Sequence, residues 1–192
     1  MRKLKYALMF LAFAALPLHA ASLEERMEPC LGCHGEKGQS ETPDTPSLGG
    51  QPSAAMLIQL YLFREKRRAN EIMNALAKEM TDADLQSISD FLSKLPPPNA
   101  PDAAPDPARM AEGAAVARKN HCGICHNPDY SGRDNIPRIA AQREDYLLKS
   151  LRDYKSGERK GYDAPMAEVL VSMSDADLQA VSYYIAHWKP GQ

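Results

Sequence analysis

The sequence is poor in cysteine and aromatic residues, and it carries no excess of charge of one sign. Its 192 residues include four cysteines and one tryptophan, and the formal net charge is −2. Without a surplus of positive charge the chain lacks the attraction on which nucleic-acid binding depends, so we expect no nucleic-acid partner. The cysteines are too few to staple a small scaffold, so their placement is more informative than their number.

Long hydrophobic runs are missing as well. The apolar run at 6–18 is too short to cross a bilayer core of roughly 30 Å. Three basic residues precede it and the small residues LHAAS (18–22) follow it. This order is typical of a secretory signal peptide, so we predict one over 1–21, cleaved after Ala20 or Ala21, and a periplasmic protein. An uncleaved N-terminal anchor is the alternative.

No segment shows the alternating pattern of a β-strand, and the chain instead repeats a helical unit. TPSLGGQ (45–51) returns as IPRIAAQ (136–142), and MTDADLQ (80–86) returns as MSDADLQ (173–179). A repeat of this length indicates a duplicated domain. We therefore predict an all-α protein made of two tandem domains.

A proline-rich segment separates the two copies. PPPNAPDAAPDPA (96–108) favours an extended spacer over a packed element. It divides the chain into a first domain at 22–95, a linker at 96–108 and a second domain at 109–192.

Helix starts and apolar stripes recur in both copies. Thr81 and Ser174 each precede an acidic residue by three positions, which predicts a capping box. Helical stripes follow these caps, at Leu85, Ile88, Leu92 and Leu95 and at Leu178, Val181, Ile185 and Trp188. A second helix is predicted in each domain, around Leu60 and around Leu151. Small residues at Gly113, Ala114 and Ala117 would let another helix approach closely.

All four cysteines lie in the motifs CLGCH (30–34) and CGICH (122–126). Residues three apart on a helical turn share a face. Two thiols placed in this way can form thioethers with one haem, and the adjacent histidine can bind its iron. We predict two covalently bound haem c groups, attached through Cys30, Cys33, Cys122 and Cys125, with His34 and His126 as iron ligands.

Three other uses of the cysteines were weighed. A thioredoxin-like redox pair needs a strand-to-helix context and normally occurs once. A zinc site would have to gather ligands across the proline-rich linker. Structural disulfides are the third alternative in an exported chain.

Methionine is the expected sixth ligand of a haem that transfers electrons. Met73 and Met166 correspond between the copies and follow polar loops at 64–72 and 156–165, so we favour them. Met80 and Met173 also correspond but directly precede the helix caps, where a core residue is expected. They remain the alternative pair. Met56 is interpreted as packing, and His121 and His187 as surface residues.

The chain resembles the dihaem cytochrome c4 family over most of its length. The resemblance is carried by CLGCHGEKGQS, TPSLGGQ and FREKRRANEIMNALAKEMTDADL in the first half. In the second half it is carried by CGICHNPDYSG, IPRIAAQREDYLLKSLRDYKSGERKGYDAPM and MSDADLQAVSYYI. It implies two class I cytochrome c folds in tandem, with His34 and Met73 and then His126 and Met166 as the axial pairs.

The function implied is that of a dihaem electron carrier without a substrate of its own. Its expected partners are redox proteins, with a quinol-oxidising complex or a dehydrogenase as donor and a terminal oxidase or reductase as acceptor. Peripheral association with the membrane is compatible with this function. The alternatives are a cytochrome subunit of a dehydrogenase, such as a flavocytochrome, and an enzyme of the dihaem peroxidase type. The basic cluster REKRR (64–68) is either a docking patch or a solvated helix end.

Overall fold

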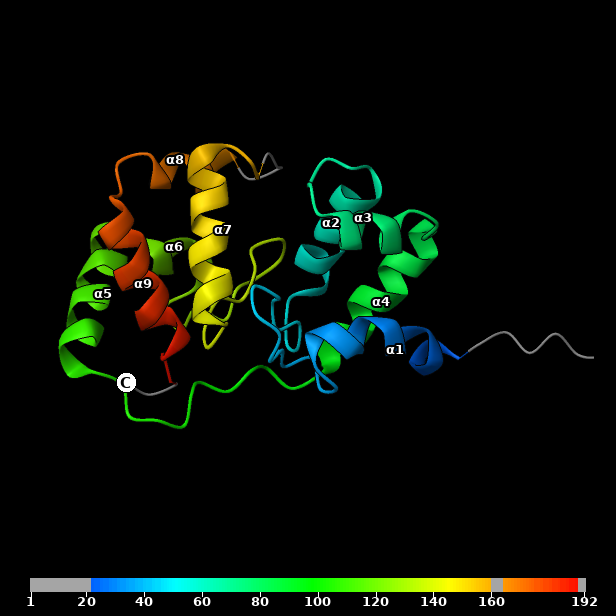
Figure 1. Ribbon diagram of the computed structural model, residues 1–192, viewed down its shortest axis with the longest axis horizontal. Coiled ribbons are helices and arrows are strands. Elements are labelled where there is room, and N and C mark those ends of the chain that lie inside the picture. Colours follow the sequence, from blue (N-terminus) through cyan, green and yellow to red (C-terminus); the bar gives the residue numbers. More distant parts are fainter. Residues whose placement is uncertain (1–21, 160–163, 190–192) are drawn as a thin grey trace, which may run out of the picture.

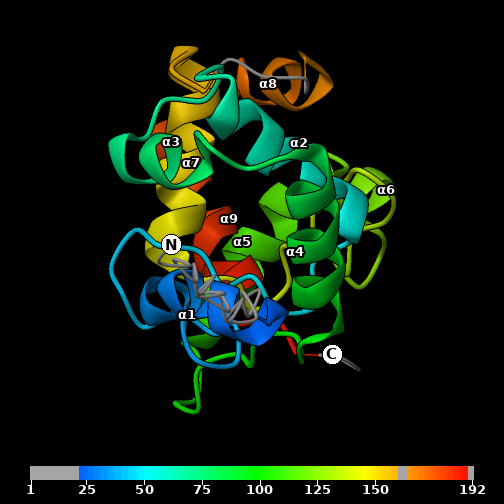
Figure 2. The same ribbon diagram turned by 90° about the vertical axis from the view of Figure 1, so that its right-hand side faces the viewer.

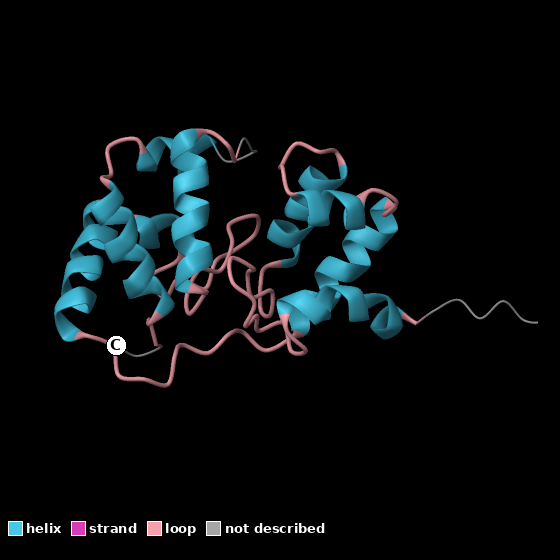
Figure 3. Ribbon diagram, viewed as in Figure 1, coloured by secondary structure: helices cyan, strands magenta, loops and turns pink. Residues whose placement is uncertain are grey.

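The computed structural model describes residues 22–159 and 164–189, and the predicted signal peptide at 1–21 lies outside them. In the described part of the chain the regular elements are helices (Figure 3). No strand forms there, and the β-bridge between Arg133 and Ile136 is isolated. The predicted all-α architecture is confirmed. No helix in these two ranges is long and apolar enough to cross a membrane.

Four helices form the first domain: α1 (Leu23–His34), α2 (Ser53–Arg64), α3 (Glu71–Ala77) and α4 (Asp82–Lys94). Its core lies between α2 and α4, with one methionine added from α1. The buried residues of this core are Met27, Met56, Leu60, Leu85, Ile88 and Leu92. The predicted stripe of the last helix and the packing role of Met56 are confirmed.

The second domain repeats this arrangement with α5 (Pro107–Lys119), α6 (Cys122–His126), α7 (Glu144–Ser156), α8 (Ala164–Leu170) and α9 (Asp175–Ala186). By position in the repeat, α7, α8 and α9 correspond to α2, α3 and α4. Tyr130 packs edge-to-face against Tyr184 and Trp188, with ring centroids 6.0 and 5.7 Å away. These aromatic contacts add a well-ordered core at the end of α9.

Both predicted capping boxes are present. The Thr81 side chain accepts a hydrogen bond from the Asp84 N–H at 3.2 Å, and the Asp84 carboxylate accepts one from the Thr81 N–H at 2.8 Å. Ser174 and Asp177 form the same pair at 3.1 and 2.8 Å. Each box satisfies N–H groups that a helix start leaves unpaired, and so fixes where α4 and α9 begin.

Helices α5 and α9 approach each other closely at Gly113, as the small-residue stripe predicts. A Cβ atom at this position would lie 2.2 Å from the Ala180 carbonyl oxygen and 2.4 Å from the Tyr184 Cβ atom. A side chain at 113 would therefore push the two helices apart.

The linker runs beside both domains and joins them at one side of the molecule (Figure 1). Helix α5 begins at Pro107, two residues before the predicted start of the second domain. Asp106 caps this helix by accepting hydrogen bonds from the Ala108 and Arg109 N–H groups at 2.8 and 3.1 Å. Proline suits the first helical position, where no N–H donor is needed, so the helix extends into the proline-rich segment.

The two domains face each other through loops, and the helices lie mainly on the outer sides (Figures 1 and 3). Figure 2, turned by 90°, shows α1 to α4 in front of the second domain. The interdomain loops are those that follow the two Cys-x-x-Cys-His motifs in the sequence.

Candidate haem-binding site

Each Cys-x-x-Cys-His motif ends a helix. Helix α1 continues through the first motif and stops at His34, and α6 consists of the second motif alone. The chain then turns at Gly35, with φ of 86°, where a Cβ atom would lie 2.0 Å from the Gln39 carbonyl oxygen. Asn127 takes the corresponding place with φ of 69°. With ψ of 143° and 156°, both residues lie outside the left-handed helical region. Glycine adopts this backbone freely, whereas Asn127 holds it under strain.

The two histidines are held in the same way. The His34 Nδ1 atom lies 2.8 Å from the Pro46 carbonyl oxygen, and the His126 Nδ1 atom lies 2.8 Å from the Pro137 carbonyl oxygen. A carbonyl can only accept, so Nδ1 carries the proton and Nε2 is left as the ligand nitrogen. Burial lowers the pKa of His34, although the bond to Pro46 opposes the shift. The neutral imidazole that a metal requires is therefore favoured.

No disulfide joins the four cysteines, all of which lie among the described residues. Burial raises the pKa of Cys30 and of Cys122. Reactive pairs of the thioredoxin kind have lowered pKa values instead, so the shift argues against the redox-pair alternative. Within 22–159 and 164–189 no group of three or more His, Cys, Asp and Glu side chains is placed to hold a metal ion.

One continuous cavity of about 1280 Å³ connects the two motifs through the domain boundary. This volume exceeds the upper range of a pocket for one small ligand, roughly 300 to 1000 Å³. Its lining includes every residue predicted to bind a haem: Cys30, Cys33, His34, Met73, Cys122, Cys125, His126 and Met166. The cavity thus brings the predicted ligands of both domains to one shared space.

Met73 and Met166 occupy equivalent places, each the third residue of a short helix. Asn70 caps α3 by accepting a hydrogen bond from the Met73 N–H at 2.9 Å. Helix α3 begins at Glu71, so the polar loop predicted at 64–72 is shorter than expected. Both methionines are partly buried against the core of their own domain. A capped helical turn holds the Met73 backbone more firmly than a loop would.

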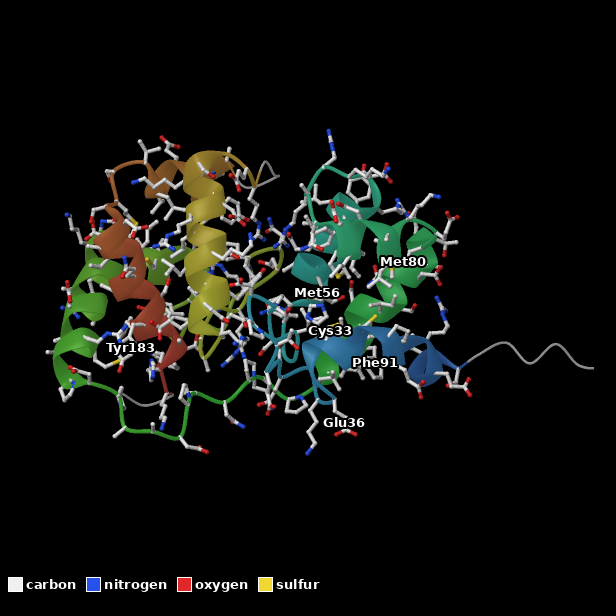
Figure 4. All side chains as sticks on the ribbon, in the orientation of Figure 1. Cys33, Glu36, Met56, Met80, Phe91 and Tyr183 are labelled. Carbon is white, nitrogen blue, oxygen red and sulfur yellow. The ribbon has the colours of Figure 1, made fainter. Side chains whose placement is uncertain are left out.

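Met80 and Met173 also line the cavity. Met173 is 3% exposed and belongs to the core of the second domain, whereas Met80 is partly buried. Figure 4 labels Met80, Met56 and Cys33, all in the first domain. Since both pairs of methionines reach the cavity, the choice of Met73 and Met166 as ligands stays a prediction.

His121 and His187, the other two histidines of the described residues, lie outside the two haem-binding motifs. His187 is half-buried, and its ring lies against that of Tyr183 with centroids 4.0 Å apart. His121 is exposed, in left-handed backbone with φ of 56°, directly before Cys122.

Positive side chains in the cavity provide a test of whether haem fits. The Arg138 Nε atom is buried without a hydrogen-bond partner, and burial lowers its pKa. Arg68 and Arg159, from different domains, both donate to the Gln59 Oε1 atom, at 2.7 and 3.0 Å. In the described ranges none of these three arginines forms a salt bridge. Haem carries propionate carboxylates, so guanidinium groups that lack carboxylate partners suit it.

The pKa of Tyr146 is affected by the same positive side chains. Burial by itself raises the pKa of this phenol, but the guanidinium groups of Arg68 and Arg159 outweigh burial and lower the pKa to about 7. Arg68 also donates to the Tyr146 hydroxyl at 3.2 Å. The cavity is therefore electrostatically prepared for an anionic group near the domain boundary.

No local pattern in the sequence distinguishes these arginines from other basic residues. In the REKRR cluster, Arg64 pairs with Asp82 at 2.8 Å and Arg68 donates to Gln59 at 2.7 Å. Lys66 and Arg67 are exposed, although they also line the cavity. The cluster is therefore not a single docking patch or a single solvated helix end. Only its middle residues face solvent.

The sequence model of the cytochrome c family matches residues 26–96 and 110–189, once in each domain. Cytochrome c4 from Thiocapsa roseopersicina is 30% identical, over 81% of this chain and 85% of its own length. The chain belongs to the dihaem cytochrome c4 family. Its likeness to the crystal structure of reduced recombinant cytochrome c4 from Pseudomonas stutzeri has a TM-score of 0.77. That match has 26% identity and covers 86% of this chain and 96% of the other.

A relative with a different name is equally similar. The thiosulfate dehydrogenase electron acceptor of Thiomonas intermedia is 30% identical over 96% of this chain and 90% of its own length. As a cytochrome c4, the present chain binds two haem c groups covalently, one in each domain, and it is an electron carrier. The prediction of tandem cytochrome c domains is confirmed.

Proposed function

We propose that Cys30 and Cys33 attach the first haem, with His34 and Met73 as its axial ligands. Cys122 and Cys125 attach the second, with His126 and Met166 in the same roles. The observation that carries this assignment is that two histidines lining one cavity are held by the same contact, from Nδ1 to the carbonyl oxygen of a proline. Both Nδ1 atoms are occupied in the same way, so both Nε2 atoms are available to iron.

One-electron exchange between ferrous and ferric iron is the chemistry that haem c supplies. The side chains of this protein set how readily it happens. The thioether sulfur of Met73 or Met166 favours the reduced state, and the carbonyl hold on each histidine fixes its orientation. Arg68, Arg138 and Arg159 line the cavity and would offset the charge of the haem propionates there.

The proposed setting is the periplasm, reached by means of the signal peptide predicted at 1–21. There the protein takes single electrons from a quinol-oxidising complex or a dehydrogenase and passes them to a terminal oxidase or reductase. Both axial positions of each iron are filled in this assignment, so peroxidase chemistry, which needs an open iron face, is not proposed.

A narrower role is favoured by one relative. The electron acceptor of thiosulfate dehydrogenase in Thiomonas intermedia aligns with almost the entire chain. The second candidate function is therefore that of a dedicated acceptor for a dehydrogenase of a reduced sulfur compound. Permanent association with such an enzyme would make the chain a subunit rather than a mobile carrier.

The test uses the holoprotein isolated from periplasm. Haem should stay with the polypeptide after acid-acetone extraction and denaturing electrophoresis, at two per chain. Replacing Cys122 and Cys125 by alanine should leave only the first haem bound. Replacing Cys30 and Cys33 by alanine should leave only the second. Extraction of either haem from the wild-type chain would contradict the assignment. Co-purification of a dehydrogenase in stoichiometric amount would select the subunit role.

A further inference from the structure

Two glutamines cross the domain boundary with the same hydrogen-bond pattern. Gln142, in the second domain, accepts from the Ser47 N–H and donates to the Ser47 carbonyl, both at 2.8 Å. Gln51, in the first domain, accepts from the Arg138 N–H at 3.0 Å and donates to the Arg138 carbonyl at 2.8 Å. Both glutamines are buried, with 3% and 6% of their surface exposed. Each glutamine side chain therefore binds the backbone N–H and the backbone carbonyl of one residue in the opposite domain.

The residues that they bind directly follow the prolines that hold the two histidines. In the peptide unit between Pro46 and Ser47, the carbonyl oxygen lies 2.8 Å from the His34 Nδ1 atom. The N–H of that same unit donates to Gln142. In the second domain, the unit between Pro137 and Arg138 joins His126 to Gln51 in the same manner.

A single amide group thus lies between each histidine and the glutamine of the other domain. When the N–H of an amide donates a hydrogen bond, its carbonyl becomes a stronger acceptor, by perhaps 10 to 30% per bond. A stronger acceptor draws the imidazole N–H proton closer and raises the basicity of the ligand nitrogen. The hydrogen bond formed by Gln142 therefore acts on His34 without any contact between the two side chains.

We propose that each domain tunes the reduction potential of the other domain's haem through these glutamines, with Gln142 acting on His34 and Gln51 acting on His126. Gln51 and Gln142 are positioning residues in this proposal. It rests on the proposed function, because it requires both histidines to be axial ligands.

The mechanism fixes the sign of the effect. A more basic histidine stabilises the ferric state, so the hydrogen bond from Gln142 lowers the potential of the first haem. Removing that bond should raise it. Loosened domain docking would have the opposite effect, because water entering the boundary stabilises the more highly charged ferric state and lowers the potential.

The experiment compares the holoprotein with its Gln142→Met and Gln51→Met variants. Methionine keeps the length of the side chain and removes both interdomain hydrogen bonds without changing charge; in Gln142→Met the local bond from the Arg143 N–H is lost as well. In Gln142→Met we expect the reduced-to-oxidised ratio of the first haem at fixed ambient potential to rise about threefold. This corresponds to a shift of about 28 mV, given roughly 59 mV per tenfold change for one electron. Gln51→Met should produce the same change in the second haem.

Nuclear magnetic resonance supplies the second readout. The ring N–H proton of His34 should move upfield in Gln142→Met, because its hydrogen bond is weaker, while that of His126 stays in place. Gln59→Met is the matched control, since Gln59 accepts an interdomain hydrogen bond from Arg159 at 3.0 Å but does not touch either proline-containing peptide. It should leave both ring protons unchanged.

Several results would overturn the proposal: a fall in potential, a shift confined to the haem of the mutated domain, or an equal ring-proton shift in Gln59→Met. Gln142→Asn, which keeps the amide but is one methylene shorter, replaces Gln142→Met where that variant fails to load both haems. The proposed function fails separately, through a wild-type protein in which either haem lacks a histidine ring N–H signal.

Discussion

Five methionines line the cavity, and two of them decide whether the irons are closed to added ligands. Met73 and Met166 each lie at the third position of a short helix and are partly buried, whereas Met173 is packed in the interior of the second domain. A thioether bound to iron gives a low-spin site with a raised potential, and its loss leaves an open coordination position. The electron-carrier assignment therefore has a test at single residues.

Met166→Ala should remove half of the weak red absorption that methionine-bound ferric haem gives. It should also open one iron to cyanide and lower the potential of that haem. Met173→Ala is the matched variant. It should keep the full band and destabilise the second domain by roughly 2 to 5 kcal/mol, the usual range for a buried methionine. Absorption spectra and urea unfolding measure the two effects, and the reverse pattern would identify Met80 and Met173 as the ligands.

At the scale of elements, helix α4 is anchored at its start by the capping box and by Arg26 from α1. Hydrogen bonds from Thr81 and then the Arg26 guanidinium lower the pKa of Asp84 to about 2. An unfolded chain has an aspartate pKa of about 3.9. Because the folded pKa is lower, the carboxylate stabilises the native state fully above about pH 4, and this stabilisation is lost as the pH falls toward 2.

Asp84→Asn should therefore be less stable than the wild type at neutral pH, and the difference should shrink between about pH 4 and pH 2. Thr81→Ala removes the partner hydroxyl and should lower the free energy of unfolding by about 1 kcal/mol. Urea unfolding at a series of pH values measures both. A stability difference for Asp84→Asn that stays constant down to pH 2 would contradict the assignment of its pKa.

The contact between α5 and α9 leads to another prediction. Gly113→Ala places a Cβ atom 2.2 Å from the Ala180 carbonyl oxygen, which cannot move without shifting α9. We expect it to destabilise the second domain by about 1 to 3 kcal/mol, although alanine is the better helix former. Ala115 lies on the exposed side of α5 and provides the control, since Ala115→Gly should cost only about 1 kcal/mol of helix propensity. A gain in stability for Gly113→Ala that mirrors the loss in Ala115→Gly would show that helix propensity, rather than packing, sets the effect.

Elements with a strong local signal could be predicted from the sequence. Thr81 and Ser174 mark the starts of α4 and α9, because each is followed three residues later by an aspartate. The apolar stripes that follow these caps are buried as expected. Helices α3 and α8 have seven residues each, too few for a periodic pattern to stand out. The start of α1 is hard to predict for another reason, because its capping box at Ser22 lies directly beside the predicted cleavage site.

The cavity residues divide in the same way. The cysteines and histidines are recognisable because their chemistry fixes a spacing of a few residues. Gln51 and Gln142 recur in the repeat, yet their partners lie 87 and 95 residues away in the sequence. The pairing of Arg68 with Arg159 through Gln59 also depends on how two domains dock. Such contacts have no local pattern from which they could be predicted.

At the scale of the whole molecule, the two domains differ in charge. The first, at 22–95, has 8 basic and 12 acidic residues, and the second, at 109–192, has 12 and 11. Arg138 adds a half-buried positive charge to the cavity lining in the second domain, where the first domain has Ser47. Positive surroundings stabilise the reduced iron, which carries the smaller positive charge, so the second haem should be the easier to reduce.

A spectroscopic redox titration of the Met73→His and Met166→His variants assigns each reduction potential to its haem. Each variant replaces one iron ligand and should therefore shift only one of the two potentials. Arg138→Gln should lower the higher of the two wild-type potentials. Raised salt should reduce the part of the difference that comes from exposed charge and leave the part from Arg138. A higher potential for the first haem would contradict the order.

The interdomain hydrogen bonds carry a consequence for the origin of the chain. Gln51 and Gln142 are equivalent in the repeat, and so are their partners Arg138 and Ser47, so each domain presents the same patch to the other. A patch that pairs with its own copy is the defining property of a two-fold symmetric dimer. A single-domain ancestor with this patch would pair with a second copy of itself as a homodimer. Duplication of its gene and fusion of the two copies would then give the present chain. The linker then made the encounter intramolecular, which frees the two surfaces to diverge, as Ser47 and Arg138 already have.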